Sequence, residues 1–557
     1  MKTLHFCTRI FQLLLCVLLA SFLVSCQEEK STDKQVRPNI ILMFTDELQF
    51  SDIGAYGGEI PTPAIDKLAL EGMKFTRAYT TASMCTPSRF SVLTGLYPGR
   101  CRAASFLVAN PQSQPYNIAW NTWITADLQT LPSVLSENGY ATGMAGKWHV
   151  GHLPDSIQLP KLEPDAQLDD PQVEEKLRSR QTAHEHQVKS DAGFDYAASV
   201  LWENFDNHPI KALQFHNFPW ITRGAFDFLE EQKSGEKPFF LYLTPTAIHG
   251  PNHVADLDKD KTYTLEGRKP EVLQYNMDEN KLKKELEVVA PQVAHRYAGI
   301  SQIDHQLALV REKLHEIGKD QNTIIIFMSD HNIEPGKATS YEKGIQIPMI
   351  VYWPGITKGS ESSAMVSSID VFPTVLEAAG IGAKVAENCD GQSFMKVIEG
   401  IQATNRKYVY SENGYTRSIS DGRYKYIALR YPNSLVQDMQ ENHLDHAPSY
   451  VERWPQAHSA IAIQSYPGYF DQNQLYDLEK DPYEQRNIYV EQPEIALTLK
   501  NALKDHLQKF VHPFDLTDID YLESEAYQMK YAENKAWDLA NIPWLSRDHG
   551  SINWPPK

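Results

Sequence analysis

The chain has 557 residues, which is enough for one large domain and a smaller partner at roughly 100–200 residues per domain. Hydrophobic residues make up 42% and charged residues 22%, and this ordinary globular composition excludes a disordered, collagen-like or multispanning membrane protein. With 53 Lys and Arg against 71 Asp and Glu, the formal net charge is −18, so the chain is a poor candidate for binding nucleic acid. A site for an anionic ligand would have to be a local cationic pocket.

The N-terminal segment has the features of a targeting signal rather than of a folded domain. Two basic residues precede an apolar run over residues 10–24, which is shorter than the about 20 residues of a membrane-spanning helix. The run ends in LVSC at Cys26, which resembles a bacterial lipobox, where cleavage leaves a lipidated cysteine. A plain secretory signal is the alternative. We expect a signal peptide over 1–25, a polar tether over 26–36, and a lipid anchor in the bacterial cell envelope, at the outer membrane or cell surface.

Four short apolar runs alternate with helical patterns along the next part of the chain. The runs span residues 39–44, 140–145, 239–243 and 323–328. Continuous apolar segments of this length are typical of buried parallel strands. Thr62 as a cap and Pro63 in the first turn predict one helix, and apolar residues spaced three and four apart over 300–317 predict another. Strands that alternate with helices indicate an α/β fold, so we expect a large, mostly parallel or mixed sheet sandwiched by helices.

The pattern changes after about residue 400. Residues 406–430 alternate in polarity around a turn at the Asp-Gly pair 421–422, as in an antiparallel hairpin, and residues 494–511 fit a helix. We therefore expect an N-terminal domain over residues 37–400. A smaller C-terminal α+β subdomain over residues 401–557 would contain a small antiparallel sheet, a helix and a tail.

Polar side chains capable of acid–base or metal chemistry follow each predicted strand. They are Asp46 and Glu47, Lys147 and His149, His249, and Asp330 and His331, in the order of the four strands. The carboxyl ends of parallel strands meet at one edge of a sheet, where open α/β sheets bind their ligands, so we expect these side chains to converge. Because Lys147 and His149 lie two apart in an extended stretch, both should point the same way.

The segment CTPSRFSVLTG over residues 85–95 carries the sharpest local signal. Pro87 suits the first turn of a helix and Gly95 suits its end. Cys85 would then lie at a helix N-terminus, where free N–H groups and the helix dipole favour an anion. Arg89 lies one turn further on and can face the same point. A buried structural cysteine is the alternative, but it does not account for the Pro, Arg and Thr-Gly at these offsets.

This segment resembles the signature of the type I sulfatases, C-x-P-S-R followed by T-G, in the alkaline-phosphatase-like superfamily. Further segments that match the family stand in order at residues 38–47, 62–66, 146–151, 249–251, 329–331, 336–337, 341–345 and 475–482. The resemblance covers nearly all of residues 37–510. It implies an alkaline-phosphatase-like fold and a hydrolase that acts on sulfuric ester bonds.

The resemblance also implies a modified cysteine. Cys85 would be oxidised by a formylglycine-generating enzyme to formylglycine (3-oxoalanine), which hydrates to a diol. One hydroxyl attacks sulfur and releases the alcohol, and loss of the other hydroxyl's proton then expels inorganic sulfate. The implied catalytic set is Cys85, Arg89, Lys147, His149, His249 and Lys337. Lys147 and Lys337 would bind the sulfate. His149 would take the diol proton, and His249 would protonate the leaving oxygen.

A divalent metal is the other group that the resemblance implies, usually Ca²⁺ and less readily Mg²⁺. Its ligands would be Asp46, Glu47, the modified side chain of Cys85, Asp330 and His331. Oxygen donors of this kind suit either ion. Two positions depart from the family's commonest pattern, which has Asp at 47 and Asn at 331. Glu47 is one methylene longer and binds either directly or through water, and the nitrogen of His331 is a less typical ligand for Ca²⁺.

An exported bacterial sulfatase is expected to desulfate an extracellular polysaccharide or its oligosaccharides, of the algal glycan or glycosaminoglycan type. Its expected partners are this sulfated carbohydrate, the maturation enzyme and a membrane, with no nucleic acid. Two alternatives stay open. A phosphodiester or phosphonate monoester hydrolase of the same superfamily would bind a similar tetrahedral anion. A non-catalytic glycan-binding lipoprotein would require a decayed motif, whereas the motif residues of this chain are intact apart from the two departures.

Overall fold

The structure is a computed structural model, and it describes residues 37–525 with gaps at 112–113, 271–274, 334, 383–387, 443–461, 463–464 and 511–513. The expected signal peptide, the lipidated Cys26 and the tether lie outside the described residues, as does the end of the tail from residue 526. These features stay predictions. None of the helices within the described ranges is long and apolar enough to cross a bilayer.

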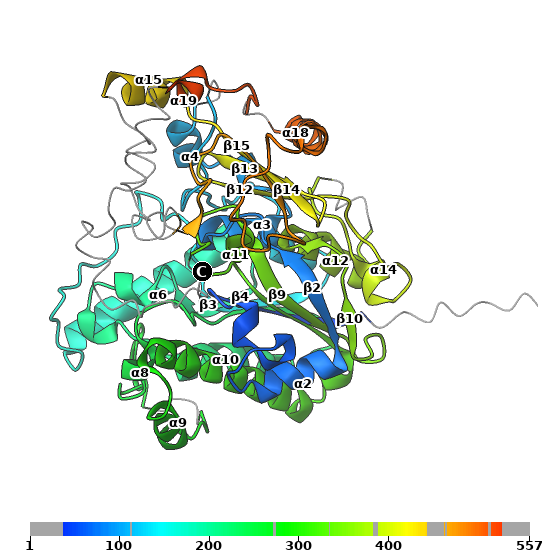
Figure 1. Ribbon diagram of the computed structural model, residues 1–557. Helices are drawn as coiled ribbons and strands as arrows, with labels where there is room; N and C mark the ends of the chain where they lie inside the picture. The colour runs from blue at the N-terminus through cyan, green and yellow to red at the C-terminus, as the bar shows by residue number, and fades with distance from the viewer. Residues whose placement is uncertain are drawn as a thin grey trace, which may run out of the picture. The chain divides into compact units, whose positions relative to one another are not determined.

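Within the described ranges, nine strands form a central mixed sheet (Figure 1). Its order is β10 (Ser360–Ser362), β2 (Met73–Tyr79), β9 (Gln346–Tyr352), β8 (Thr323–Ser329), β1 (Asn39–Thr45), β5 (Phe239–Thr244), β3 (Ala141–Lys147) and β4 (Tyr196–Leu201), and β11 (Val366–Ser367) also pairs with β2. The strands from β8 to β4 are parallel, whereas β9 is antiparallel to both of its neighbours. The four predicted strands are therefore confirmed as β1, β3, β5 and β8.

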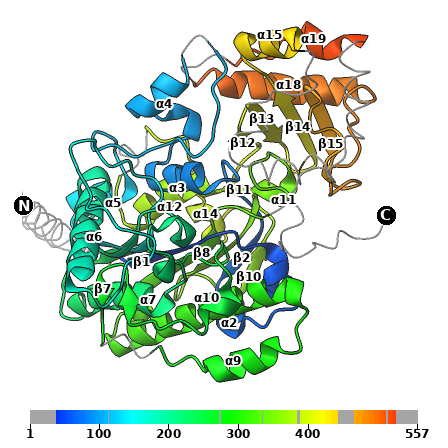
Figure 2. The same cartoon turned by 90° about the vertical axis from the view of Figure 1, so that its left-hand side faces the viewer.

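Helices cover both faces of this sheet, as Figure 2 shows. Alternate residues of β1 point to opposite faces, so Leu42 and Phe44 join one core cluster and Ile41 and Met43 join the other. The first cluster includes residues of α3 (Cys85–Thr94), α5 (Leu131–Glu137) and α12 (Val371–Ala378). The second includes residues of α2 (Pro63–Glu71), α7 (Phe218–Glu231) and α10 (Pro291–Glu316). The predicted α/β sandwich is confirmed.

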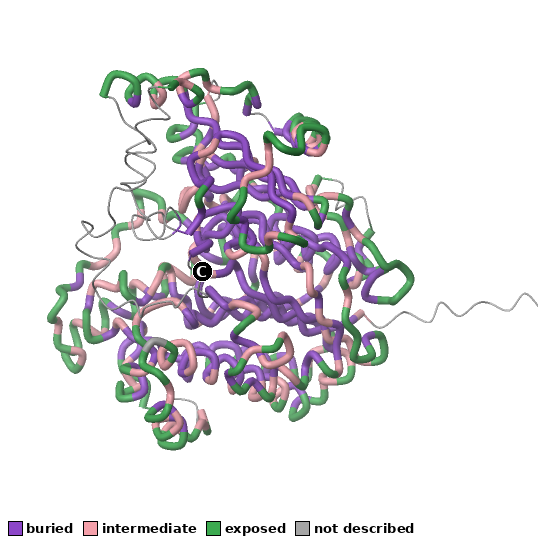
Figure 3. The backbone as a smooth tube through the Cα atoms, viewed as in Figure 1, coloured by how far each residue is buried: buried purple, intermediate pink, exposed green. Residues whose placement is uncertain are grey.

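A small antiparallel sheet follows, as predicted. The strands β12 (Val409–Asn413), β13 (Thr416–Ser420), β14 (Tyr424–Leu429) and β15 (Asn473–Asp477) pair in chain order. Helix α18 (Pro493–Leu507) packs against this sheet. Both sheets are largely buried in Figure 3. The exact position of the domain boundary near residue 400 stays a prediction.

The other elements connect these layers. They are α4 (Ala104–Ala109), α6 (Pro171–Ala192), α8 (His253–Asp256), β6 (Tyr263–Thr264), β7 (Gly267–Arg268), α9 (Glu279–Leu286), α11 (Glu342–Ile345), α14 (Met395–Ile398), α15 (Asn433–Glu441) and α19 (Asp520–Glu523). The long helix α6 lies against β4 at the edge of the central sheet. The short helix α11 lies immediately before β9, and the carbonyl of its Gly344 accepts the N–H of Asn332, three residues after β8, at 3.0 Å.

Candidate active site

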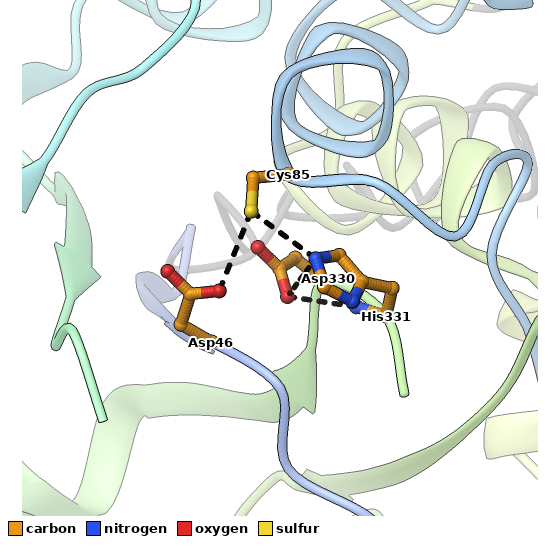
Figure 4. Close-up of side chains that lie close together, drawn as sticks. All are labelled: Asp46, Cys85, Asp330 and His331. Atoms are coloured by element: carbon orange, nitrogen blue, oxygen red, sulfur yellow. Dashed lines mark hydrogen bonds and ion pairs between the residues drawn. The ribbon is translucent and has the colours of Figure 1, made fainter. Parts of the chain in front are cut away.

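The carboxyl edge of the central sheet gathers the polar residues that follow its strands. Asp46 follows β1, and Asp330 and His331 follow β8, and all three side chains are fully buried. Figure 4 shows them pointing toward one another and toward Cys85, and one possible ligand atom from each of the four lies within 4.8 Å of the others. The Sγ atom of Cys85 lies 3.6 Å from Oδ1 of Asp46 and 3.2 Å from Nε2 of His331. The predicted convergence is confirmed for this group.

Helix α3 brings the cysteine and an arginine to the group. Cys85 is the first residue of α3, so the positive end of the helix dipole faces the site. Arg89, one turn later and fully buried, donates a hydrogen bond of 2.9 Å to Oδ2 of Asp330 and lies 3.6 Å from Oδ2 of Asp46. Burial acts to lower the pKa of Arg89, but the carboxylates of Asp330 and Asp46, together with other nearby groups, raise it above its ordinary value, and the guanidinium stays charged. The helix therefore presents a side chain at 85 with a fixed cation beside it.

Two lysines supply further positive charge. The ammonium of Lys147, at the end of β3, pairs with Asp46, and that of Lys337 pairs with Glu47. Burial alone would lower the pKa of both lysines, but the carboxylates of Asp46 and Glu47 raise it above its ordinary value. Both ammonium groups therefore stay charged at neutral pH. Arg89, Lys147 and Lys337 are each paired with a carboxylate, so the site holds buried cations that an anion could use, and a net cationic pocket for an anionic ligand stays a prediction.

The two predicted catalytic histidines lie in different environments. His249 follows β5 and is 17% exposed, with its Nε2 3.3 Å from Nδ2 of Asn204 and 3.8 Å from Oε1 of Glu47. Burial and the charges of Lys147 and Arg89 hold the pKa of His149 well below its ordinary value, so its ring is neutral and able to accept a proton.

The prediction that residues 147–149 are extended is wrong at His149. Strand β3 ends at Lys147, and His149 has a φ of 53°. The chain turns there because the N–H groups of Trp148 and His149 bond to the carbonyls of Leu201 and Trp202, at 2.8 and 3.0 Å. The end of β4 therefore determines where the His149 backbone lies.

The group formed by Asp46, Asp330, His331 and the side chain at 85 suits a divalent cation. The lysine and arginine beside Asp46 outweigh its burial and hold the pKa of this carboxyl well below its usual range, so it is ionised. The Nδ1 atom of His331 lies 2.6 Å from the Asn332 carbonyl, which can only accept, so the lone pair of a neutral ring is on Nε2, toward the group. Glu47 lies outside this group and faces Lys337 and His249. Its role as a metal ligand stays a prediction.

A second buried group of possible ligands consists of His216, His253 and Asp256. The rings of His216 and His253 stack, with centroids 3.9 Å apart and an interplanar angle of 21°. Ring nitrogens bind a metal in the plane of the ring, and stacked rings direct their lone pairs side by side rather than to one point. We therefore assign these side chains to packing.

The residue that sequence reasoning missed is Asn204. It follows β4, where a single Asn has no helical or strand periodicity and no motif to mark it. Its amide lies within hydrogen-bonding distance of His249 only in the folded sheet, where β4 and β5 are separated by β3 alone and their carboxyl ends lie at the same edge.

The fold and the site together define an α/β protein whose sheet edge brings a helix N-terminus, a group of possible metal ligands and buried cations to one place. Residues 38–381 match the family model described as Sulfatase, and residues 336–445 match the one described as N-sulphoglucosamine sulphohydrolase, C-terminal. The chain belongs to the sulfatase family and is a hydrolase that acts on sulfuric ester bonds.

Known relatives extend over most of the chain. It is 28% identical over 493 residues to an ulvan-active sulfatase of Formosa agariphila, covering 86% of this chain and 80% of the relative. It is 26% identical over 571 residues to an N-acetylgalactosamine-6-O-sulfatase of Bacteroides thetaiotaomicron, covering 87% and 96%. A solved structure from work on glycosaminoglycan metabolism by Bacteroides thetaiotaomicron has a TM-score of 0.58 and 23% identity, covering 85% of this chain and 99% of that one. That structure shows the shared fold.

Proposed function

We propose that this sulfatase removes sulfate from a sulfated polysaccharide or its oligosaccharides, of the algal glycan or glycosaminoglycan type. The observation that carries the proposal is the position of Cys85 at the N-terminus of α3, within one group with Asp46, Asp330 and His331. The names of the two curated relatives, one active on ulvan and one on a sulfated N-acetylgalactosamine, support the carbohydrate class.

Two groups would complete the site. Asp46, Asp330 and His331, with the side chain at 85, would hold a divalent cation, for which we propose Ca²⁺, and this cation would supply positive charge beside the sulfate oxygens. Cys85 would be converted to formylglycine by a maturation enzyme, and the hydrated side chain would supply the attacking hydroxyl.

The buried cations bind and orient the ester. Lys147, Lys337 and Arg89 present N–H donors to the negatively charged sulfate oxygens. Lys147 and Arg89 are fully buried, and Lys337 is nearly so, and a charge interacts more strongly in such a low-dielectric site than in water. These three cations hold the sulfate so that the oxygen linking sulfur to the alcohol faces His249. His249 is half-buried, so the released alcohol can reach solvent there.

The two histidines move protons at different stages. As the S–O bond to the alcohol breaks, its electron pair stays on the alcohol oxygen, and the Nε2 proton of His249 neutralises that oxygen. The neutral ring of His149 accepts the proton that must leave the side chain at 85 before sulfate is released. A positioned acid or base of this kind contributes roughly 10²–10⁴-fold to the rate.

The test is sulfate release from a panel of sugar sulfates, with N-acetylgalactosamine 6-O-sulfate, glucosamine 6-O-sulfate and ulvan and carrageenan oligosaccharides as members. Wild type should release sulfate from at least one member, and Cys85→Ala from none. Mass spectrometry of the peptide that contains residue 85 should find formylglycine. Active enzyme with only intact thiol would contradict the mechanism. Faster hydrolysis of an aryl phosphonate than of an aryl sulfate would favour a phosphonate hydrolase instead.

A further inference from the structure

Asn204 forms the one side-chain hydrogen bond to Nε2 of His249 that the described part of the chain provides, at 3.3 Å from Nδ2. The other ring nitrogen, Nδ1, lies 3.0 Å from the carbonyl oxygen of Gly250. A carbonyl oxygen can only accept, so Nδ1 carries the hydrogen in the neutral ring and Nε2 is the atom that gains and loses a proton. The amide of Asn204 thus touches the atom that the proposed function makes the proton donor.

We propose that Asn204 is a positioning residue that holds the Nε2 atom of His249 in place over the site until the ester binds, when the leaving oxygen replaces the amide as the partner of the Nε2 proton. This inference rests on the proposed function. An amide suits the position because it serves both protonation states of the ring. Its NH₂ group donates to the neutral Nε2, and after rotation by half a turn its oxygen accepts from the protonated one. A carboxylate could only accept, and an ammonium could only donate.

The backbone around Asn204 is fixed on both sides. Two residues earlier, the carbonyl of Trp202 accepts the N–H of His149 at 3.0 Å. The carbonyl of Asn204 itself accepts the N–H of Asn207 at 3.1 Å and opens the single turn η4 (Phe205–Asn207). Phe205 is buried, with its ring edge-on to His216 at 5.4 Å. The segment that carries Asn204 is therefore held in place, and the Asn204 side chain reaches from the end of β4 to His249, which follows β5.

The way the rate depends on the leaving group distinguishes a residue that positions the acid from one that only stabilises the fold. A nitrophenolate leaves readily without a proton, whereas a sugar alkoxide is strongly basic and must be protonated. The test compares wild type and Asn204→Ala on 4-nitrophenyl sulfate and on the panel sugar sulfate that wild type cleaves fastest. We expect kcat/KM to fall about 10–100-fold on the sugar sulfate, a large part of what an acid contributes, and less than about threefold on the nitrophenyl ester.

Asn207→Ala is the matched control, because Asn207 lies in the same turn but donates to the exposed Glu203 at 3.2 Å. It should retain wild-type activity on both esters, and thermal unfolding should show both variants folded. Equal losses on both esters in Asn204→Ala, or no loss on the sugar, would overturn the inference while leaving the proposed function intact. Failure of wild type to cleave any member of the panel would instead overturn the proposed function.

Discussion

At the scale of single residues, Asp330 connects the components of the site. Its Oδ2 accepts from Arg89 at 2.9 Å, and its Oδ1 accepts the N–H groups of Glu47 at 3.2 Å and His331 at 2.8 Å. Asp330→Asn keeps the shape but removes the charge that pairs with Arg89 and that the proposed cation would require. We expect kcat/KM for sulfate release to fall at least about 100-fold, the loss typical of a missing electrostatic group, and bound calcium per chain to fall with it.

The control for this prediction is a second buried aspartate outside the site. Asp370 is fully buried, pairs with Arg406 and accepts two backbone N–H groups, from Ser367 at 2.8 Å and Gln392 at 2.7 Å. Asp370→Asn should lower the melting temperature but leave the calcium content and the activity of the folded enzyme near those of wild type. Near-normal turnover of Asp330→Asn, measured in parallel, would refute its assignment as a ligand.

At the scale of elements, the end of α3 depends on a glycine for two separable reasons. Gly95 has a φ of +68°, and a Cβ there would lie 2.7 Å from Cβ of Cys389 and 2.9 Å from the ring of Phe372. Gly318, after α10, has nearly the same φ of +69° but nothing within 4 Å of its Cβ position. Gly318→Ala should cost about 1–2 kcal/mol of unfolding free energy from backbone strain alone. Gly95→Ala should cost about 1–3 kcal/mol more, because the methyl group overpacks the core.

Urea unfolding of the two variants measures this difference directly, since both substitutions add the same methyl group at nearly the same φ. Equal losses of stability would show that Cys389 and Phe372 move aside without cost. The sequence motif predicts only the backbone reason, because a helix ends at a glycine whatever packs against it. The packing against Cys389 and Phe372 cannot be predicted from the motif.

The elements themselves could be predicted where the signal is local. The buried strands β1, β3, β5 and β8 are continuous apolar runs, and α3 begins and ends at the residues that the motif indicates. Helix α2 begins after Thr62 as predicted, but the prediction that the Thr62 side chain caps it is wrong. The hydroxyl of Thr62 bonds to Gly54 and Asp66, whereas Asp304 of α10 accepts the first N–H groups of α2, from Ala64 and Ile65.

The same limit applies to the site. The local sequence shows which strand ends carry carboxylates, but the pairing of Glu47 with Lys337 and the position of Asn204 beside His249 depend on the order of strands. The left-handed backbone of His149 likewise depends on its bonds to the carbonyls that follow β4. These features follow from tertiary contacts between segments far apart in the chain, and no periodicity or spacing within one segment encodes them.

At the scale of the whole molecule, the small sheet is joined to the active-site loop by a buried cation. Lys425 of β14 lies 2.8 Å from Glu342 of α11 and 2.8 Å from Glu484, and Glu484 accepts the N–H of Glu342 at 2.6 Å. In the loop that carries Lys337, Gly336 lies so close to Gly344 of α11 that no side chain fits between them. The C-terminal sheet thus helps to determine where a proposed sulfate-binding lysine lies.

Lys425→Met tests this connection, because it leaves the carboxylates of Glu342 and Glu484 buried without their cation. Removing one partner of a buried pair costs roughly 3–5 kcal/mol, so we expect a loss of that order in urea unfolding at pH 7, with a raised KM for sulfate esters. Burial raises the pKa of Glu484 to about 7 even though Lys425 opposes it, so this carboxylate is the one most easily neutralised. Adding Glu484→Gln should therefore restore part of the lost stability. A single variant as stable as wild type, or a double variant less stable than the single one, would show that the buried charges do not join the small sheet to the active-site loop.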